Sequence, residues 1–154
     1  MDRRKLILSR LFVVLQGSIT SLAAASWHRN RGDLDLDQRP GGILLDADET
    51  AVISMSERKP SAMASPNLVS MSPEVYYVPS DKKPKNTDIG DLVNDTRTSI
   101  VKAVLIDEEL RELVSTNGTV RYDGLVSDLA KGRDMAGELG IGFTFIYPLI
   151  PSEL

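Results

Sequence analysis

Two aspartates, Asp46 and Asp48, follow directly on the apolar run 43–45 and offer the clearest chemistry in the sequence, with Glu49 beside them. Carboxylates at the end of a strand can serve as a nucleophile, as a general acid or base, or as ligands for magnesium. The chain holds 22 acidic residues, so a short acidic pattern also arises readily by chance. The alternative is that these three carboxylates are solvated or face a partner.

The pattern Asp-x-Asp-x-Thr at 46–50 resembles the first motif of haloacid-dehalogenase-type phosphotransferases. The resemblance implies a nucleophile at Asp46, a general acid or base at Asp48, and a magnesium ion that neutralises charge. That family needs a parallel sheet of alternating strands and helices, a lysine such as Lys131, and a later acidic pair, for which Asp134 is a weak match. Here a loop and another strand follow instead, so we favour a protein that is not an enzyme, with no catalytic residue, cofactor or metal site.

A second group of interest lies in the polar stretch 26–42, which is predicted to be a loop. Tryptophan and arginine are enriched at the hot spots of protein interfaces, so Trp27 and the arginines near it favour an exposed segment that contacts a partner. The other interpretation is a capping or packing role for Trp27. Together with the acidic group, the candidate partner contacts are Trp27, Arg29, Arg31, Asp46, Asp48 and Glu49.

Composition narrows the possible functions. The chain has 154 residues, a net charge of −4 and no cysteine, and His28 is its only histidine. Disulfides, thiol nucleophiles, zinc–thiolate sites and multi-histidine sites within one chain are therefore excluded. Nucleic-acid binders usually carry a basic face, and a net charge of −4 does not suggest one. No uninterrupted apolar run reaches the roughly 20 residues of a membrane span, so we expect no contact with a membrane.

The strongest strand signal lies at 139–149, where large apolar side chains alternate with smaller residues. Ile141, Phe143, Phe145, Tyr147 and Leu149 share one face, which we expect the rest of the fold to cover. The other predicted elements are helices at 3–24, 88–106 and 108–114, and strands at 43–53, 68–79, 119–130 and 135–149. Residues 54–67 form a predicted mobile excursion. This order favours a single α+β domain over 1–154, an antiparallel sheet of about four strands with two main helices on one face.

Several stretches together resemble the tail terminator (tail completion, minor tail) proteins of long-tailed bacteriophages. They are the amphipathic helix at 4–22, the acidic strand at 43–52, Pro66-Asn67-Leu68-Val69-Ser70-Met71-Ser72-Pro73-Glu74-Val75-Tyr76, the long helix that follows, and the closing segment 122–147. The match covers most of the chain and rests on pattern rather than on a signature motif.

The resemblance implies a virion structural protein that is assembled in the host cytoplasm. Such proteins form a homo-oligomeric ring, usually a hexamer, at the head-proximal end of the tail tube, where they end tube polymerisation and join the tail to the neck. The implied partners are further copies of the chain, the tail tube protein, and a neck or head–tail connector protein. DNA would only pass through the lumen. The alternative within the same class is another phage neck or head-completion adaptor.

Overall fold

The computed structural model describes residues 2–52, 67–80, 86–115, 117–127 and 138–154. The predicted excursion at 54–67 lies outside them except for its last residue, and so do Lys131 and Asp134. The helices and strands are α1 (Arg3–Gln16), β1 (Trp27–Arg29), β2 (Gly41–Leu45), β3 (Glu49–Ala51), β4 (Asn67–Met71), β5 (Glu74–Val78), α2 (Asn86–Ile106), α3 (Glu108–Val114), β6 (Thr119–Ser127) and β7 (Leu139–Leu149).

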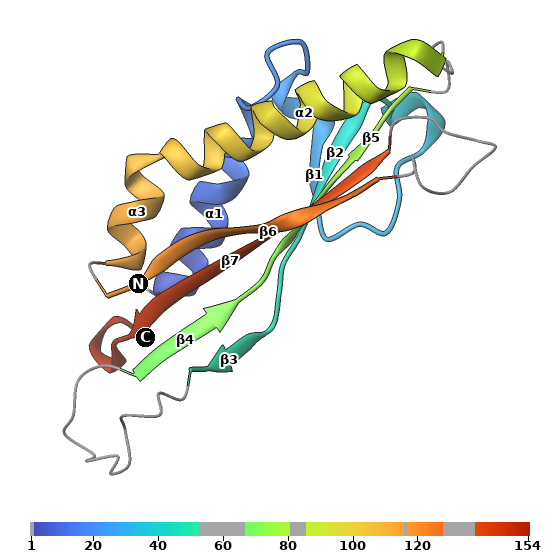
Figure 1. Ribbon diagram of the computed structural model, residues 1–154. Coiled ribbons are helices and arrows are strands. Elements are labelled where there is room, and N and C mark those ends of the chain that lie inside the picture. Colours follow the sequence, from blue (N-terminus) through green and yellow to red (C-terminus); the bar gives the residue numbers. More distant parts are fainter. Residues whose placement is uncertain (1, 53–66, 81–85, 116, 128–137) are drawn as a thin grey trace.

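All seven strands belong to one sheet, in which β7 is central (Figure 1). The order is β1-β2-β5-β7-β4-β3, and β6 lies on the other side of β7. β5 pairs with the first part of β7, from Leu139 to Gly142, while β4 pairs with its last part, from Phe145 to Leu149. β4 and β5 thus follow each other along one side of β7, with a break at Ser72 and Pro73. A break at Pro73 is expected, because proline cannot donate to the ladder.

The α+β class is confirmed, and the two main helices are present as α1 and α2, but the sheet is mixed and has seven strands where about four antiparallel strands were predicted. The strand predicted at 43–53 divides into β2 and β3, and the one at 68–79 divides into β4 and β5. A further strand, β1, lies within the predicted loop 26–42 and runs parallel to β2, so the sheet is mixed. The short helix at 108–114 is present as α3.

Helix α1 ends eight residues earlier than the predicted boundary at residue 24. Gly17 occupies its C-cap position, and the Gly17 amide donates to the carbonyls of Leu15 and Val14. Glycine is unfavourable inside a helix and favoured just after one, which explains why the helix stops there. At the other end, the Asp2 side chain caps the helix by accepting from the Arg4 amide.

The main core lies between the helices and one face of the sheet. Figure 1 shows α1, α2 and α3 on the same side of the sheet. The predicted stripe on β7 faces them and is buried at Ile141, Phe143, Phe145 and Tyr147, with Leu149 partly buried. The opposite face carries a smaller cluster under the 31–40 segment, formed by Leu34, Ile43 and Val78. The stripe therefore organises the fold as predicted.

Candidate functional site

The acidic group after β2 is held in place by a basic residue from β1. The Nη2 of Arg29 donates to both carboxylate oxygens of Asp46, at 2.9 and 2.8 Å. The same guanidinium lies 5.8 Å from the centre of the Phe12 ring, within cation–π range. Arg29 and Asp46 are separate candidates in the sequence, 17 residues apart, and the fold brings them together. A carboxylate neutralised in this way is a poor nucleophile, because its lone pairs are occupied.

The two other acidic candidates do not converge with Asp46. Asp48 is exposed and makes no polar contact within the described residues. The Glu49 carboxylate accepts a hydrogen bond from the Tyr147 hydroxyl of β7. Burial and this bond raise the pKa of Tyr147. Between Asp46 and Asp48, the Ala47 carbonyl accepts a hydrogen bond from the Arg4 guanidinium at 2.6 Å. The acidic turn is therefore anchored to α1 through Arg4 and to β7 through Tyr147.

Trp27 is not exposed, contrary to the prediction of a partner-contacting loop. Its side chain is 4% exposed and lies over Gly42 of β2, where an added Cβ would come within 2.3 Å of the indole. The structure therefore supports the packing role that the sequence left open. Arg31 lies beyond β1 and is 3.9 Å from Asp35, at the limit of an ion pair. The Trp27 Nε1 and the Arg29 Nε are buried without an acceptor in the described part of the chain.

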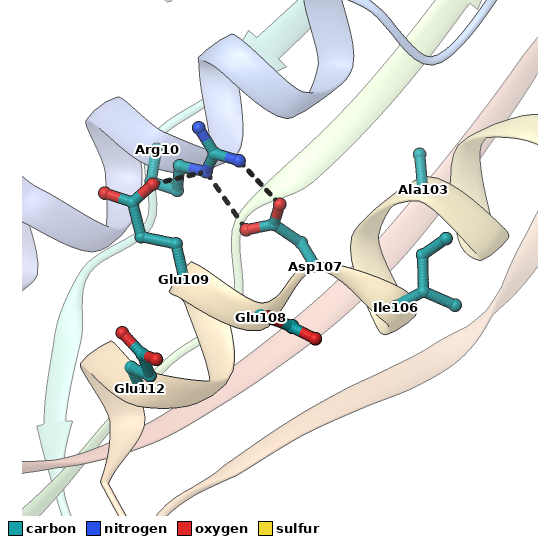
Figure 2. Close-up of a pocket in the computed structure, with 7 residues that line it drawn as sticks. All are labelled: Arg10, Ala103, Ile106, Asp107, Glu108, Glu109 and Glu112. Atoms are coloured by element: carbon teal, nitrogen blue, oxygen red, sulfur yellow. Dashed lines mark hydrogen bonds and ion pairs between the residues drawn. The ribbon is translucent and has the colours of Figure 1, made fainter.

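A groove with a charged lining, which the sequence analysis did not identify as a site, lies where α2 passes into α3 (Figure 2). Its volume is about 660 Å³. The guanidinium of Arg10 from α1 donates to Asp107 through Nε at 3.0 Å and Nη2 at 2.7 Å, and its Nε lies 3.1 Å from Glu109. Ile106, which is 58% exposed, also lines the groove.

Asp107 has two roles at this groove. Its side chain accepts from the Leu110 amide at 3.0 Å and caps α3, and it also accepts two hydrogen bonds from Arg10. The hydrogen bond from Arg10 lowers the pKa of Asp107, and the same bond raises the pKa of Arg10. A signal was present in the sequence, because Arg10 interrupts the apolar stripe of α1. The sequence alone does not show the partner of Arg10, and the structure pairs it with the start of α3.

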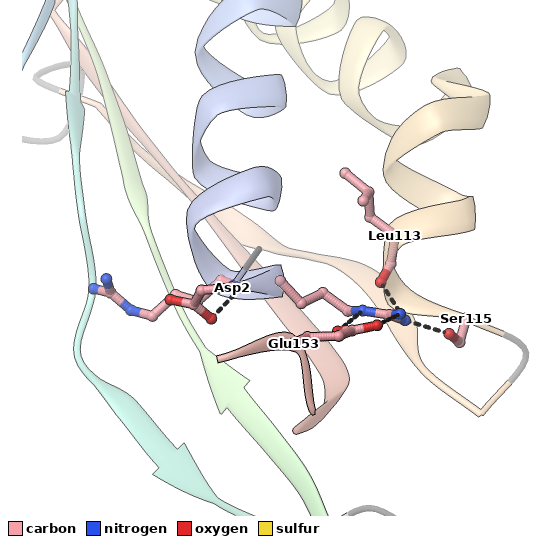
Figure 3. Close-up of polar contacts among 6 residues, drawn as sticks. Asp2, Leu113, Ser115 and Glu153 are labelled. Atoms are coloured by element: carbon pink, nitrogen blue, oxygen red, sulfur yellow. Dashed lines mark hydrogen bonds and ion pairs between the residues drawn. The ribbon is translucent and has the colours of Figure 1, made fainter. Parts of the chain in front are cut away.

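The two ends of the chain meet at a third polar cluster (Figure 3). Arg3 donates to the Glu153 carboxylate at 3.1 and 2.6 Å, to the Leu113 carbonyl at 3.2 Å and to the Ser115 hydroxyl at 2.6 Å. Arg3 thus joins α1, the end of α3 and the C-terminal turn. A role of this kind is architectural, since each of these contacts lies within the chain.

Two further observations bear on the class of site. Among the described residues, no three histidine or acidic side chains gather closely enough to hold a metal ion. Within the same part of the chain, no helix has both the length and the apolar character that a bilayer crossing requires.

The comparisons with known proteins add no assignment: no family model matches the chain, and no match is found among the curated proteins.

Proposed function

We propose that this chain is a non-enzymatic structural protein of a long-tailed bacteriophage, a tail terminator. In this proposal, copies of the chain form a ring, a hexamer, at the head-proximal end of the tail tube. The ring ends polymerisation of the tube and joins the tail to the neck.

The order and pairing of the elements carry this proposal. An N-terminal helix precedes the strands β2 to β5, the long helix α2 follows them, and the β6–β7 pair ends the chain. This is the layout on which the resemblance to tail terminators rests. β7 lies at the centre of the sheet, so the segment most similar to that family also forms the core of this fold.

The free edge of the sheet supports self-assembly. Within the described residues, β6 pairs only with β7, so the backbone groups on its other side have no strand partner. Val126 on this strand is 70% exposed. Natural proteins usually protect such edges, and unprotected ones serve as places where another chain adds.

The acidic turn supports a structural role over a phosphotransferase. Asp46 is bound by Arg29, and the strands that follow β2 are antiparallel to their neighbours rather than part of alternating strand–helix units. The net charge of −4 also suits a ring through which DNA passes, since each lysine or arginine contact with phosphate adds affinity.

The test is the mass of the purified chain, measured by light scattering alone and with the tail tube protein, together with negative-stain images. The proposal predicts rings, and a sixfold ring has six times the chain mass of 16.9 kDa. Compact monomers under both conditions would contradict the proposal. Magnesium-dependent phosphatase activity that is lost in Asp46→Asn would contradict its non-enzymatic part.

A further inference from the structure

We propose that the sheet of this chain continues into a second copy, through an antiparallel pair between the β6 edge of one copy and the β3 edge of the next. The inference deepens the proposed function and rests on it, because it supplies the contact between neighbouring subunits of the ring. The contact joins two different edges of identical chains, so it is head-to-tail. Head-to-tail contacts repeat into a ring when the rotation closes.

β6 and β3 are the outermost strands in one half of the sheet. In the half that contains the end of β7, the order is β6-β7-β4-β3. One row of paired residues crosses these four strands, and its members are Val120, Phe145, Met71 and Glu49. In the part of the chain that the structure describes, neither β6 nor β3 has a strand on its outer side. A second copy beside the first, in the same orientation, therefore brings the two edges together at about the same level.

The directions of the two strands fit an antiparallel pair. β6 runs antiparallel to β7. β3 runs antiparallel to β4, which is itself antiparallel to β7, so β3 runs parallel to β7. In two copies of the same orientation, β6 of one copy is therefore antiparallel to β3 of the other. The helices of both copies would lie on the same side of the continued sheet, because all three helices cover one face (Figure 1).

The backbone of β6 directs two residues of its first half outward. The Phe143 amide donates, at 3.3 Å, to a carbonyl at the break between β4 and β5, on the side of β7 away from β6. Successive residues of a strand bond to opposite sides, so Thr144 bonds toward β6, where Arg121 is its partner. The residues on either side of Arg121 therefore direct their N–H and C=O groups to the free edge. They are Val120 and Tyr122.

The backbone of β3 is arranged in the same way. The Val52 amide donates to the Leu68 carbonyl at 2.8 Å, so Val52 and Thr50 bond toward β4. The N–H and C=O groups of Glu49 and Ala51 therefore point to the outer edge. Each of the two edges thus presents two residues whose backbone groups await a partner strand.

One register uses all four of these residues, with Val120 opposite Ala51 and Tyr122 opposite Glu49. Each such pair exchanges two hydrogen bonds, so the register forms four. It is offset by two residues from the row that crosses a single chain, and a sheet that closes on itself requires an offset of this kind. A further shift by two residues would place β3 beside the bulge of β6 between Tyr122 and Gly124.

On the helix-covered face, this register brings opposite charges together. Glu49 of one copy would lie beside Tyr122 of the next. The Tyr122 hydroxyl accepts a hydrogen bond from the Arg97 Nε at 3.2 Å, and the Arg97 guanidinium lies 5.4 Å from the centre of the Tyr122 ring. The Glu49 carboxylate would therefore meet the guanidinium of Arg97.

The open face of the sheet is complementary as well. The Arg121 side chain is 61% exposed, and in this register it would lie diagonally across from Asp48, within reach of a long side chain. Asp48 is exposed and has no polar contact of its own in the described ranges. The nearby carboxylate of Asp123 is already bound, because it accepts from Thr144 and from Arg121. The contact would thus give Asp48 and Glu49 the partner-facing role that the sequence predicts for them.

The other edges of the sheet fit a ring less well. At the β1 edge, the Trp27 amide donates to the Ala24 carbonyl, so the preceding turn already uses part of the outer side. Two β6 edges related by a two-fold axis would form a closed dimer, which cannot extend into a ring.

Proline at an outward amide tests each edge separately. Ala51→Pro and Val120→Pro each remove an N–H group that points to a free edge, and leave the bonds to β4 and β7 in place. We expect either change to raise the dissociation constant for self-association at least about tenfold, measured by sedimentation velocity. Ser127→Pro is the matched control, because it makes the same change on β6 beyond the residues that β3 would reach, and it should associate like the wild type.

Circular dichroism shows whether each variant is folded. Ala51 is exposed, whereas Val120 packs partly against the core. Arg121→Glu, at an exposed side chain, is therefore the second variant for the β6 edge. It should also weaken self-association, because the new carboxylate would face Asp48.

A mixture of two variants tests the head-to-tail pairing itself. The Ala51→Pro chain keeps a working β6 edge, and the Val120→Pro chain, or Arg121→Glu in its place, keeps a working β3 edge. Each chain alone should be monomeric, and an equimolar mixture should form one-to-one dimers and nothing larger.

The outcomes separate this inference from the proposed function. Dimers of the Ala51→Pro chain alone would overturn the inference, because they would show β6 pairing with β6. Unchanged association of the variants at both edges, together with a wild-type ring, would overturn the inference and leave the proposed function standing. A wild-type chain that stays monomeric with and without tube protein would overturn both.

Discussion

Asp107 provides a test of the packing of α1 against α3, because one carboxylate both caps α3 and binds Arg10. Replacement by asparagine keeps an oxygen that can cap the helix but removes the charge. Replacement by alanine removes both. The difference between the two variants therefore separates the contribution of the cap from that of the ion pair.

The expected magnitudes follow from the contacts. Arg10 makes two bonds to Asp107, at 3.0 and 2.7 Å, and the two side chains are 30% and 12% exposed. Hydrogen bonds to charged groups contribute about 1.5–3 kcal/mol, which partial exposure of Arg10 reduces. We expect Asp107→Asn to lower the free energy of unfolding by about 1–2 kcal/mol. Asp107→Ala should cost about 1 kcal/mol more, the usual contribution of an N-cap.

The effect should depend on pH, because Arg10 lowers the pKa of Asp107 in the folded state. A carboxylate with a lowered folded pKa stabilises the fold above its unfolded pKa, which is about 3.9. That contribution is lost as the pH falls from there through the folded pKa. The difference between the wild type and Asp107→Asn should therefore be full near pH 7 and should shrink below about pH 4.

Urea denaturation followed by circular dichroism at several pH values measures these differences. Glu109→Gln is the matched control, since the Glu109 side chain is 57% exposed and should contribute less than about 1 kcal/mol. Equal losses in Asp107→Asn and Asp107→Ala would refute the separate role of the cap. A difference from the wild type that persists undiminished at pH 3 would refute the role of the ion pair.

Three further predictions concern the fold. Gly118→Ala should destabilise the chain by about 3 kcal/mol, because an added Cβ would lie 2.0 and 2.3 Å from two backbone carbonyl oxygens. The control Gly32→Ala should have little effect, because nothing lies within 4 Å of its added Cβ, and thermal unfolding compares the two variants. Arg3→Ala should speed amide exchange in the C-terminal turn, measured by mass spectrometry, because its bonds to Glu153 are lost; unchanged exchange there would count against that anchor. Tyr147→Phe should lower the free energy of unfolding by about 1 kcal/mol at neutral pH. Burial keeps the Tyr147 hydroxyl protonated in the fold, so this residue should destabilise the wild type above about pH 10, and the variant should lack that contribution. A wild type whose stability is unchanged above that pH would contradict this.

The central strand and the helix caps could be predicted because their signals are local. Alternation at 139–149 requires one buried face whatever the neighbours are, and β7 has that face. Aspartate is favoured at the position directly before a helix, and the structure shows Asp107 as the cap of α3. Signals of this kind depend on only a few adjacent residues.

The number of strands could not be predicted, because it depends on contacts between distant segments. β1 has three residues, and it is a strand because it lies beside β2, with Trp27 opposite Gly42. The pairing of Arg10 with Asp107 and of Arg29 with Asp46 likewise joins residues far apart in the chain. Residue type alone shows that such groups are charged, and only the fold shows which groups meet.

The position of the chain in an assembled phage particle tests the central claim most directly. Particles that carry a gold-labelled or density-tagged copy of the chain can be imaged by electron microscopy, and the position of the label can be measured along the tail axis. The proposed function predicts a ring of label at the head-proximal end of the tail tube, between the tube and the neck. Label at the distal end of the tail, or particles that lack the chain, would contradict it.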